Sequence, residues 1–119
     1  MEVPVNGEAL LLRLLQGTGR RSQAIASNIA NQNTPGYKRQ VVRFEDMLAQ
    51  ALEAGGEHLL SIEPAAVTDN ETPARLDGNN VNLELEVYAS RENRVLAETY
   101  RTILQGHYQM LDAAISNGN

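Results

Sequence analysis

The chain has 119 residues and a formal net charge of −5; 42% of its residues are hydrophobic but only 4% are aromatic. This length corresponds to one domain at most, and an acidic balance without clustered Lys and Arg argues against a nucleic-acid binder. The chain has no cysteine, which excludes disulfides, zinc–thiolate sites and thiol nucleophiles.

Residues 1–33 predict one long helix. One stripe of positions three and four residues apart contains the apolar residues Leu11, Leu15, Ile25 and Ile29. Pro35 and Gly36 end the helix, because proline lacks an amide hydrogen and disfavours a helical conformation of the residue before it. Gly17 and Gly19 favour a weak or kinked turn here over a point where another backbone comes close.

Residues 34–80 predict an irregular middle segment that contains one short helix. Apolar residues at helical spacing place this amphipathic helix from about Arg43 to Ala54, and Gly55 and Gly56 end it. The stretch 59–62 fits either a short strand or a segment that pairs with something else. Turn-forming residues dominate the sequence from there to residue 80, so we expect residues 55–80 to be poorly ordered in an isolated subunit.

Residues 81–119 predict a second long helix, with Asn82 as a candidate cap and Glu84 and Glu86 as helix-start charges that suit the helix dipole. It carries two stripes at heptad spacing. The first contains Leu85, Ala89, Leu96, Thr99, Ile103, Gly106, Met110 and Ala113, interrupted by Glu92. The second contains Tyr100, Leu104, Tyr108, Leu111 and Ile115. Two stripes imply at least two neighbours.

These elements predict a mainly α fold, in which the N- and C-terminal helices form an antiparallel coiled-coil-like hairpin beside the irregular middle segment. The helices would measure roughly 40 and 52 Å, and no third long helix is predicted to cover the excess length. We therefore expect other protein molecules to supply the missing surface. The residues expected in helix packing are Leu11, Leu15, Ile25, Ile29, Leu96, Ile103, Leu104, Met110, Leu111 and Ile115.

The sequence predicts no catalytic, metal or cofactor site. His58 and His107 are far apart and have no carboxylate at metal-ligand spacing. The serines lie in no nucleophile-elbow pattern, and no glycine-rich loop fits a phosphate. No apolar run approaches the roughly 20 residues that span a membrane, and we expect no cleavable signal peptide.

Two motifs give the chain a family resemblance. The first consists of Ser27, Asn28, Ile29, Ala30 and Asn31 followed by Thr34, Pro35, Gly36 and Tyr37. This combination resembles the N-terminal signature of bacterial flagellar rod and hook proteins, in which it would be an assembly motif. The stretch 76–82, together with the end of the last helix, is similar to the proximal rod type.

The resemblance implies a structural subunit of the flagellar basal body. Its terminal helices would pack against copies of itself and other rod and basal-body proteins, forming a periplasmic axial tube between the membrane base and the distal rod. The flagellar type III apparatus would export the unfolded chain, and neither nucleic acid nor direct membrane insertion would be involved. Phe44 and Leu48 resemble an element that docks on the export gate, although Phe44 could equally anchor the short helix.

The alternative function is a cytoplasmic helical adapter or export chaperone of a type III secretion system. Such a protein would share the acidic charge and the amphipathic helices. It would not need the Thr34–Tyr37 turn beside a helix end, and it should form a defined dimer in solution. A rod subunit should instead be largely monomeric, partly helical and broad in its unfolding.

Overall fold

The computed structural model describes residues 7–117 and is mainly helical, as the sequence predicts. In chain order, its elements are α1 (Gly7–Ala30), β1 (Gln40–Val41), α2 (Phe44–Glu53), the 3₁₀ helix η1 (Leu59–Ser61), β2 (Val67–Thr68) and α3 (Leu83–Asn117). The predicted short middle helix and the 35-residue last helix are therefore present. The first six residues of the predicted N-terminal segment lie outside the described residues.

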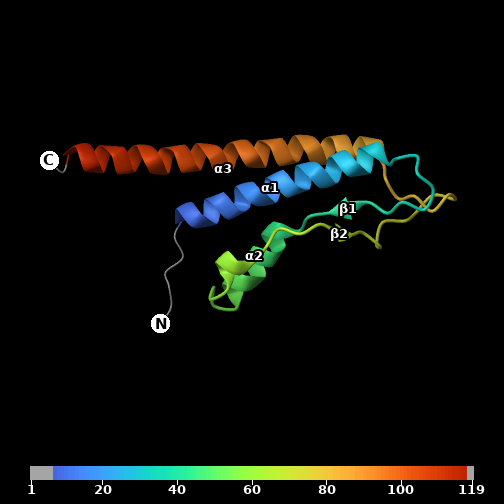
Figure 1. Ribbon diagram of the computed structural model, residues 1–119, viewed down its shortest axis with the longest axis horizontal. Coiled ribbons are helices and arrows are strands. Elements are labelled where there is room, and N and C mark those ends of the chain that lie inside the picture. Colours follow the sequence, from blue (N-terminus) through green and yellow to red (C-terminus); the bar gives the residue numbers. More distant parts are fainter. Residues whose placement is uncertain (1–6, 118–119) are drawn as a thin grey trace.

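The two long helices lie side by side and antiparallel (Figure 1). Near one end of the pair, Asn28 of α1 donates a hydrogen bond to Glu86 of α3. Near the other end, Tyr108 of α3 bonds to Glu8 of α1. The molecule measures 67 × 30 × 15 Å and has a radius of gyration of 18.1 Å, compared with about 13.5 Å for a compact chain of this length. The helical pair therefore sets an elongated shape.

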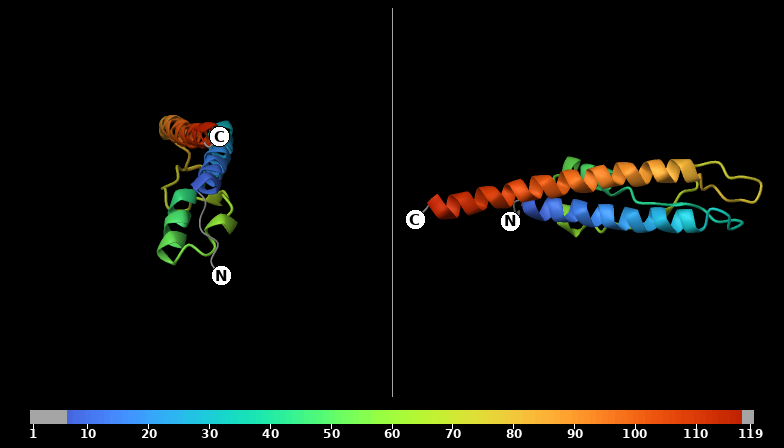
Figure 2. Two further views of the ribbon diagram at one scale, coloured as in Figure 1. Left: turned by 90° about the vertical axis from the view of Figure 1, so that its left-hand side faces the viewer. Right: turned by 90° about the horizontal axis from the view of Figure 1, so that it is seen from above.

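A small apolar core lies on a second side of α1, away from α3 (Figures 1 and 2). It consists of Ala24, Val42, Phe44, Leu48 and Leu59, with Leu10, Leu14, Ala51, Ile62 and Ala66 packed against it. Phe44 at the start of α2 and Leu59 in η1 are fully buried. α1 is thus held from two directions, while α3 packs against it from one side only.

Helix α1 runs through both of its internal glycines without a break. Gly17 is buried, and a Cβ atom at this position would overlap the ring of Phe44. A Cβ atom at Gly19 would meet nothing within 4 Å. Gly17 therefore marks a close approach, but by an aromatic side chain rather than by another backbone.

The middle segment has more structure than its sequence predicts. β1 pairs antiparallel with β2, with Gln40 opposite Thr68 and Val41 opposite Val67. The stretch 59–62, for which the sequence left open a short strand or a segment that pairs with something else, contains the 3₁₀ helix η1, with Ser61 bonded to His58. Poor order of residues 55–80 in an isolated subunit stays a prediction, although buried polar side chains hold the second half of this segment in the structure. These side chains are Asp69, Asn79 and Asn80.

Candidate assembly site

Asn28 is the centre of the first motif and is completely buried. Its side-chain oxygen accepts hydrogen bonds from the Gln40 amide at 2.8 Å and the Tyr37 hydroxyl at 3.1 Å. Its amide nitrogen donates to the Gln40 carbonyl at 2.9 Å and to Glu86 Oε2 at 3.1 Å. One side chain therefore joins α1 to the loop that follows it and to the first turn of α3.

The turn after α1 packs directly against the second motif. The Asn79 side chain donates to the carbonyls of Asn31 and Thr34, both at 2.8 Å. The Gly36 amide donates to the Asp77 carbonyl at 2.8 Å, and Gly36 has a φ of +77°, which suits glycine. A Cβ atom on Gly78 would lie 3.2 Å from the Cα of Gly36. Stretches some 45 residues apart in sequence are therefore joined by hydrogen bonds, and their loops lie at the same end of the molecule (Figure 2).

A buried charge cluster continues from this loop pair. Arg39 forms ion pairs with Glu86 and Asp69, each at 2.8 Å, and both carboxylates are almost completely buried. Hydrogen bonds from Thr72 and then from Arg39 hold the pKa of the Asp69 carboxyl well below its usual range. Burial alone would lower the pKa of Arg39, but the bonds to the two carboxylates outweigh this effect and raise it.

The sequence position of Glu86 explains only part of its role. It lies in the first turn of α3, as predicted, but it faces inward and bonds to Arg39 and Asn28. Its partners are 47 and 58 residues earlier in the chain, so no local spacing indicates them. The buried carboxylate aligns α3 with the end of α1.

A second polar cluster joins the three α-helices through Arg21 of α1, Glu45 at the start of α2 and Asn93 of α3. Arg21 of α1 donates to the Val42 carbonyl at 2.8 Å and pairs with Glu45 of α2. It also donates to Asn93 of α3 at 3.2 Å, and Asn93 in turn donates to the carbonyl of Thr18 at 2.9 Å. Burial would raise the pKa of Glu45, but the bonds from Arg21 and backbone lower it.

The residues predicted for helix packing divide into two groups. Ile25 and Leu104 are buried between α1 and α3, and four are half-buried: Leu11, Leu15, Ile29 and Leu96. The other four are exposed: Ile103, Met110, Leu111 and Ile115. The contact with α1 uses a face of α3 that buries Glu86, Asn93, Ala97 and Leu104. Part of the predicted packing surface therefore has no partner within the described chain.

One partly exposed stripe runs along α3, and we call it the outer stripe; its members Ala89, Leu96 and Gly106 are half-buried, and the rest are exposed. It consists of Leu85, Ala89, Glu92, Leu96, Thr99, Ile103, Gly106, Met110 and Ala113. Leu85 is 61% exposed, Ile103 52% and Met110 73%. Since α1 reaches α3 only as far as the contacts of Glu8 with His107 and Tyr108, residues 109–117 extend beyond it (Figure 1). In this overhang, Met110 and Ala113 belong to the outer stripe, whereas Leu111 and Ile115 belong to the second stripe of α3.

The two residues predicted to dock on an export gate have a structural role in the folded chain. Phe44 and Leu48 are buried in the core, and Phe44 anchors α2 against Gly17, so neither side chain is accessible in the folded chain. Within residues 7–117, no group of three His, Asp or Glu side chains is placed to hold a metal. No helix in this range is both long and apolar enough to cross a membrane.

Comparison with known proteins finds similarity to flagellar basal body rod proteins. A family described as flagella basal body rod protein matches residues 18–38. The chain is 32% identical to the flagellar basal body rod protein FlgB of Cereibacter sphaeroides, over 96% of this chain and 93% of that protein. It is 29% identical to FlgB of Borreliella burgdorferi, over 81% and 84%, and 24% identical to FlgB of Escherichia coli, over 94% and 91%.

Proposed function

The chain belongs to the FlgB family of flagellar basal body rod proteins, and we propose that it builds the proximal rod through its two terminal helices. The family is structural rather than enzymatic, and the family resemblance seen in the sequence is confirmed. In this proposal, copies of the chain and other rod proteins form a periplasmic tube that joins the membrane base to the distal rod.

The outer stripe of α3 carries this proposal. Its positions alternate by four and three residues from 85 to 113, a span of about 42 Å at 1.5 Å per residue. A stripe with a 3.5-residue repeat is the surface that another helix covers in a coiled coil. Large residues in one row, such as Ile103 and Met110, alternate with small ones such as Gly106 in the other. This pattern supports close packing against a neighbouring helix.

The size of the stripe favours a multi-subunit assembly over a simple dimer. With a width of about 10 Å, it offers at most roughly 400 Å², and Ala89, Leu96 and Gly106 within it are already half-buried. A stable pairwise interface needs about 800 Å² from each partner. One such stripe therefore gives a weak pair, and several neighbours must act together to hold each subunit.

The test uses paired charge changes on α3. Ile103→Glu and Met110→Glu each place a carboxylate in the outer stripe, whereas Gln105→Glu places one on an exposed position outside it. In a flagellated cell that depends on this chain, we expect the two stripe variants to be lost from isolated basal bodies and the control to be retained. All three should match the parent in helical content, because their positions are exposed. Equal retention of all three variants would reject assembly through the outer stripe.

Type III export of the unfolded chain is the second part of the proposal. Phe44 and Leu48 are buried in the folded chain, so an export gate could reach them only before folding. Phe44→Ala separates the two roles when secretion is measured independently of assembly. Reduced secretion supports docking through Phe44, while unchanged secretion with poor assembly leaves it only the role of a core anchor.

A further inference from the structure

Leu76 is a fully exposed leucine at the loop end of the molecule. It shows 111% of its reference exposed area, the largest value among the exposed large hydrophobic residues that the structure describes. Its loop lies at the end of the molecule remote from the overhang of α3 (Figure 1). Nothing in the fold of its own chain requires an apolar side chain at this position.

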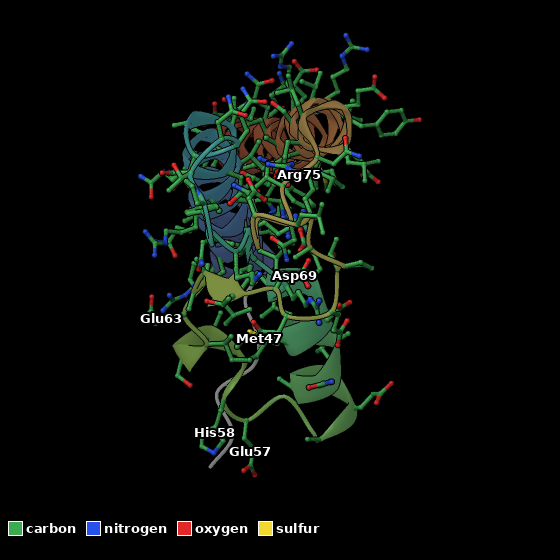
Figure 3. All side chains as sticks on the ribbon, turned by 90° about the vertical axis from the view of Figure 1, so that its right-hand side faces the viewer. Met47, Glu57, His58, Glu63, Asp69 and Arg75 are labelled. Carbon is green, nitrogen blue, oxygen red and sulfur yellow. The ribbon has the colours of Figure 1, made fainter. Side chains whose placement is uncertain are left out.

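The backbone around Leu76 is held firmly on both sides. The Gly78 amide donates to the Arg75 carbonyl at 2.9 Å and closes a tight turn around Leu76. The Arg75 guanidinium, at the end viewed in Figure 3, donates to the carbonyls of Val81 and Gln32, both at 2.6 Å. Because the turn is already ordered, binding through Leu76 would cost little conformational entropy.

A shallow groove lies at the same end of the molecule. Its volume is about 390 Å³, ample for one leucine side chain, and its lining combines apolar residues (Pro73, Val81, Leu83, Leu85) with polar ones (Gln32, Asn33, Thr72, Arg75, Asn80, Asn82). Leu83 is 43% exposed and Leu85 61%, so these two leucines are open to a partner, whereas Val81 is buried. Leu76 does not occupy the groove of its own chain, because it is fully exposed.

We propose that Leu76 of one copy of this chain seats in the groove of a second copy, a placement that rests on the proposed function. Leu85 belongs both to the groove and to the outer stripe, so a neighbour that covers the stripe is already beside the groove. Because the projecting leucine and the groove lie at the same end, two copies that point in the same direction must lie side by side to make this contact. Such a heterologous contact generates a ring or a helix of subunits.

Cross-linking tests the contact directly, because the chain has no cysteine of its own. Two differently tagged chains, one with Leu76→Cys and one with Leu83→Cys, are expressed together in a flagellated cell that depends on this chain. Isolated basal bodies are treated with a short thiol cross-linker. We expect mixed-tag dimers at least about tenfold above the control pair of Leu76→Cys with Leu52→Cys, whose exposed leucine lies on α2. Equal yields from the two pairs would overturn the contact.

A second variant pair separates this inference from the proposed function. Leu76→Ser should leave thermal unfolding unchanged but weaken incorporation into basal bodies roughly tenfold, because it removes one anchoring leucine. Leu52→Ser, the matched control, should incorporate normally. Equal incorporation of the two variants overturns the role of Leu76 while the rod function stands. Absence of the unaltered chain from basal bodies overturns the rod function and this contact together.

Discussion

At the scale of single residues, Asn28 is the most consequential polar side chain. Its four hydrogen bonds tie α1 to Tyr37, Gln40 and Glu86 in a fully buried setting. Asn28→Ala removes them all and leaves buried polar groups with fewer partners. We expect a loss of about 2–4 kcal/mol in the free energy of unfolding, measured by denaturant titration. The exposed Asn70→Ala should change it by less than about 0.5 kcal/mol.

Gly17 and Gly19 form a matched pair for a second prediction. Alanine favours a helix over glycine by roughly 1 kcal/mol, so Gly19→Ala, which meets open space, should stabilise the free chain. At Gly17 the added methyl group would overlap the buried ring of Phe44. Overpacking costs about 1–3 kcal/mol, so Gly17→Ala should be destabilising on balance. Melting temperatures that move in the same direction for both variants would contradict this explanation of the glycines.

Asp69 predicts a dependence of stability on pH. Because its pKa is lower in the folded chain than the roughly 3.9 of an unfolded aspartate, its ionised form favours folding above that value. This contribution is lost progressively as the pH falls below about 5 and through the folded pKa. Unfolding titrations between pH 7 and pH 3 should therefore show a steep loss of stability. In Asp69→Asn, stability should be lower at pH 7 and its slope with pH shallower; an unchanged slope would assign the acid sensitivity to other carboxylates.

At the scale of elements, α3 has two apolar faces, one that packs against α1 and one that lies on the outer stripe. Leu104 is buried against α1, whereas its neighbour Ile103 is 52% exposed on the outer stripe. Leu104→Ala should lower the free energy of unfolding of the isolated chain by about 2–3 kcal/mol. Ile103→Ala should change it by less than about 0.5 kcal/mol yet reduce incorporation into basal bodies. Similar unfolding energies for both variants would mean that the two faces are not distinct in the free chain.

The sequence predicts the long elements well because their signals are local. Pro35 and Gly36 end the first helix region, Gly55 and Gly56 follow the short helix, and the apolar stripes define α3. The stretch 59–62 stays ambiguous in the sequence, because a short apolar run does not distinguish a strand from a helical turn, and the structure forms a 3₁₀ helix there. Helix propensity alone treats Gly17 as a weak point of the helix. It does not show that tertiary packing against Phe44 requires the small size of this residue.

The candidate site was predictable only in part. The first motif and the two stripes of α3 are visible in the sequence. Long-range pairing that no periodicity encodes produces two further features. These are the hydrogen bonds between residues 31–36 and 77–79 and the cluster of Arg39, Asp69 and Glu86. A run of turn-forming residues therefore suggested poor order, although asparagine and aspartate side chains fix its second half through buried hydrogen bonds.

At the scale of the whole molecule, the chain is a thin, elongated body with α3 covered on one side only. We predict that the purified chain is largely monomeric, partly helical and broad in its thermal unfolding, because a single stripe gives a weak pair. Sedimentation velocity and circular dichroism check this prediction. A compact dimer with cooperative unfolding would favour the alternative function of an adapter or export chaperone.

The most direct test of assembly through α3 is the accessibility of its outer stripe before and after assembly. A single cysteine at Met110, which is 73% exposed, can be labelled with a maleimide in the free chain and in isolated basal bodies. The proposed rod packing predicts rapid labelling of the free chain and strong protection in the basal body. Equally rapid labelling in both states would show that the outer stripe stays uncovered in the rod, and the proposed assembly would be wrong.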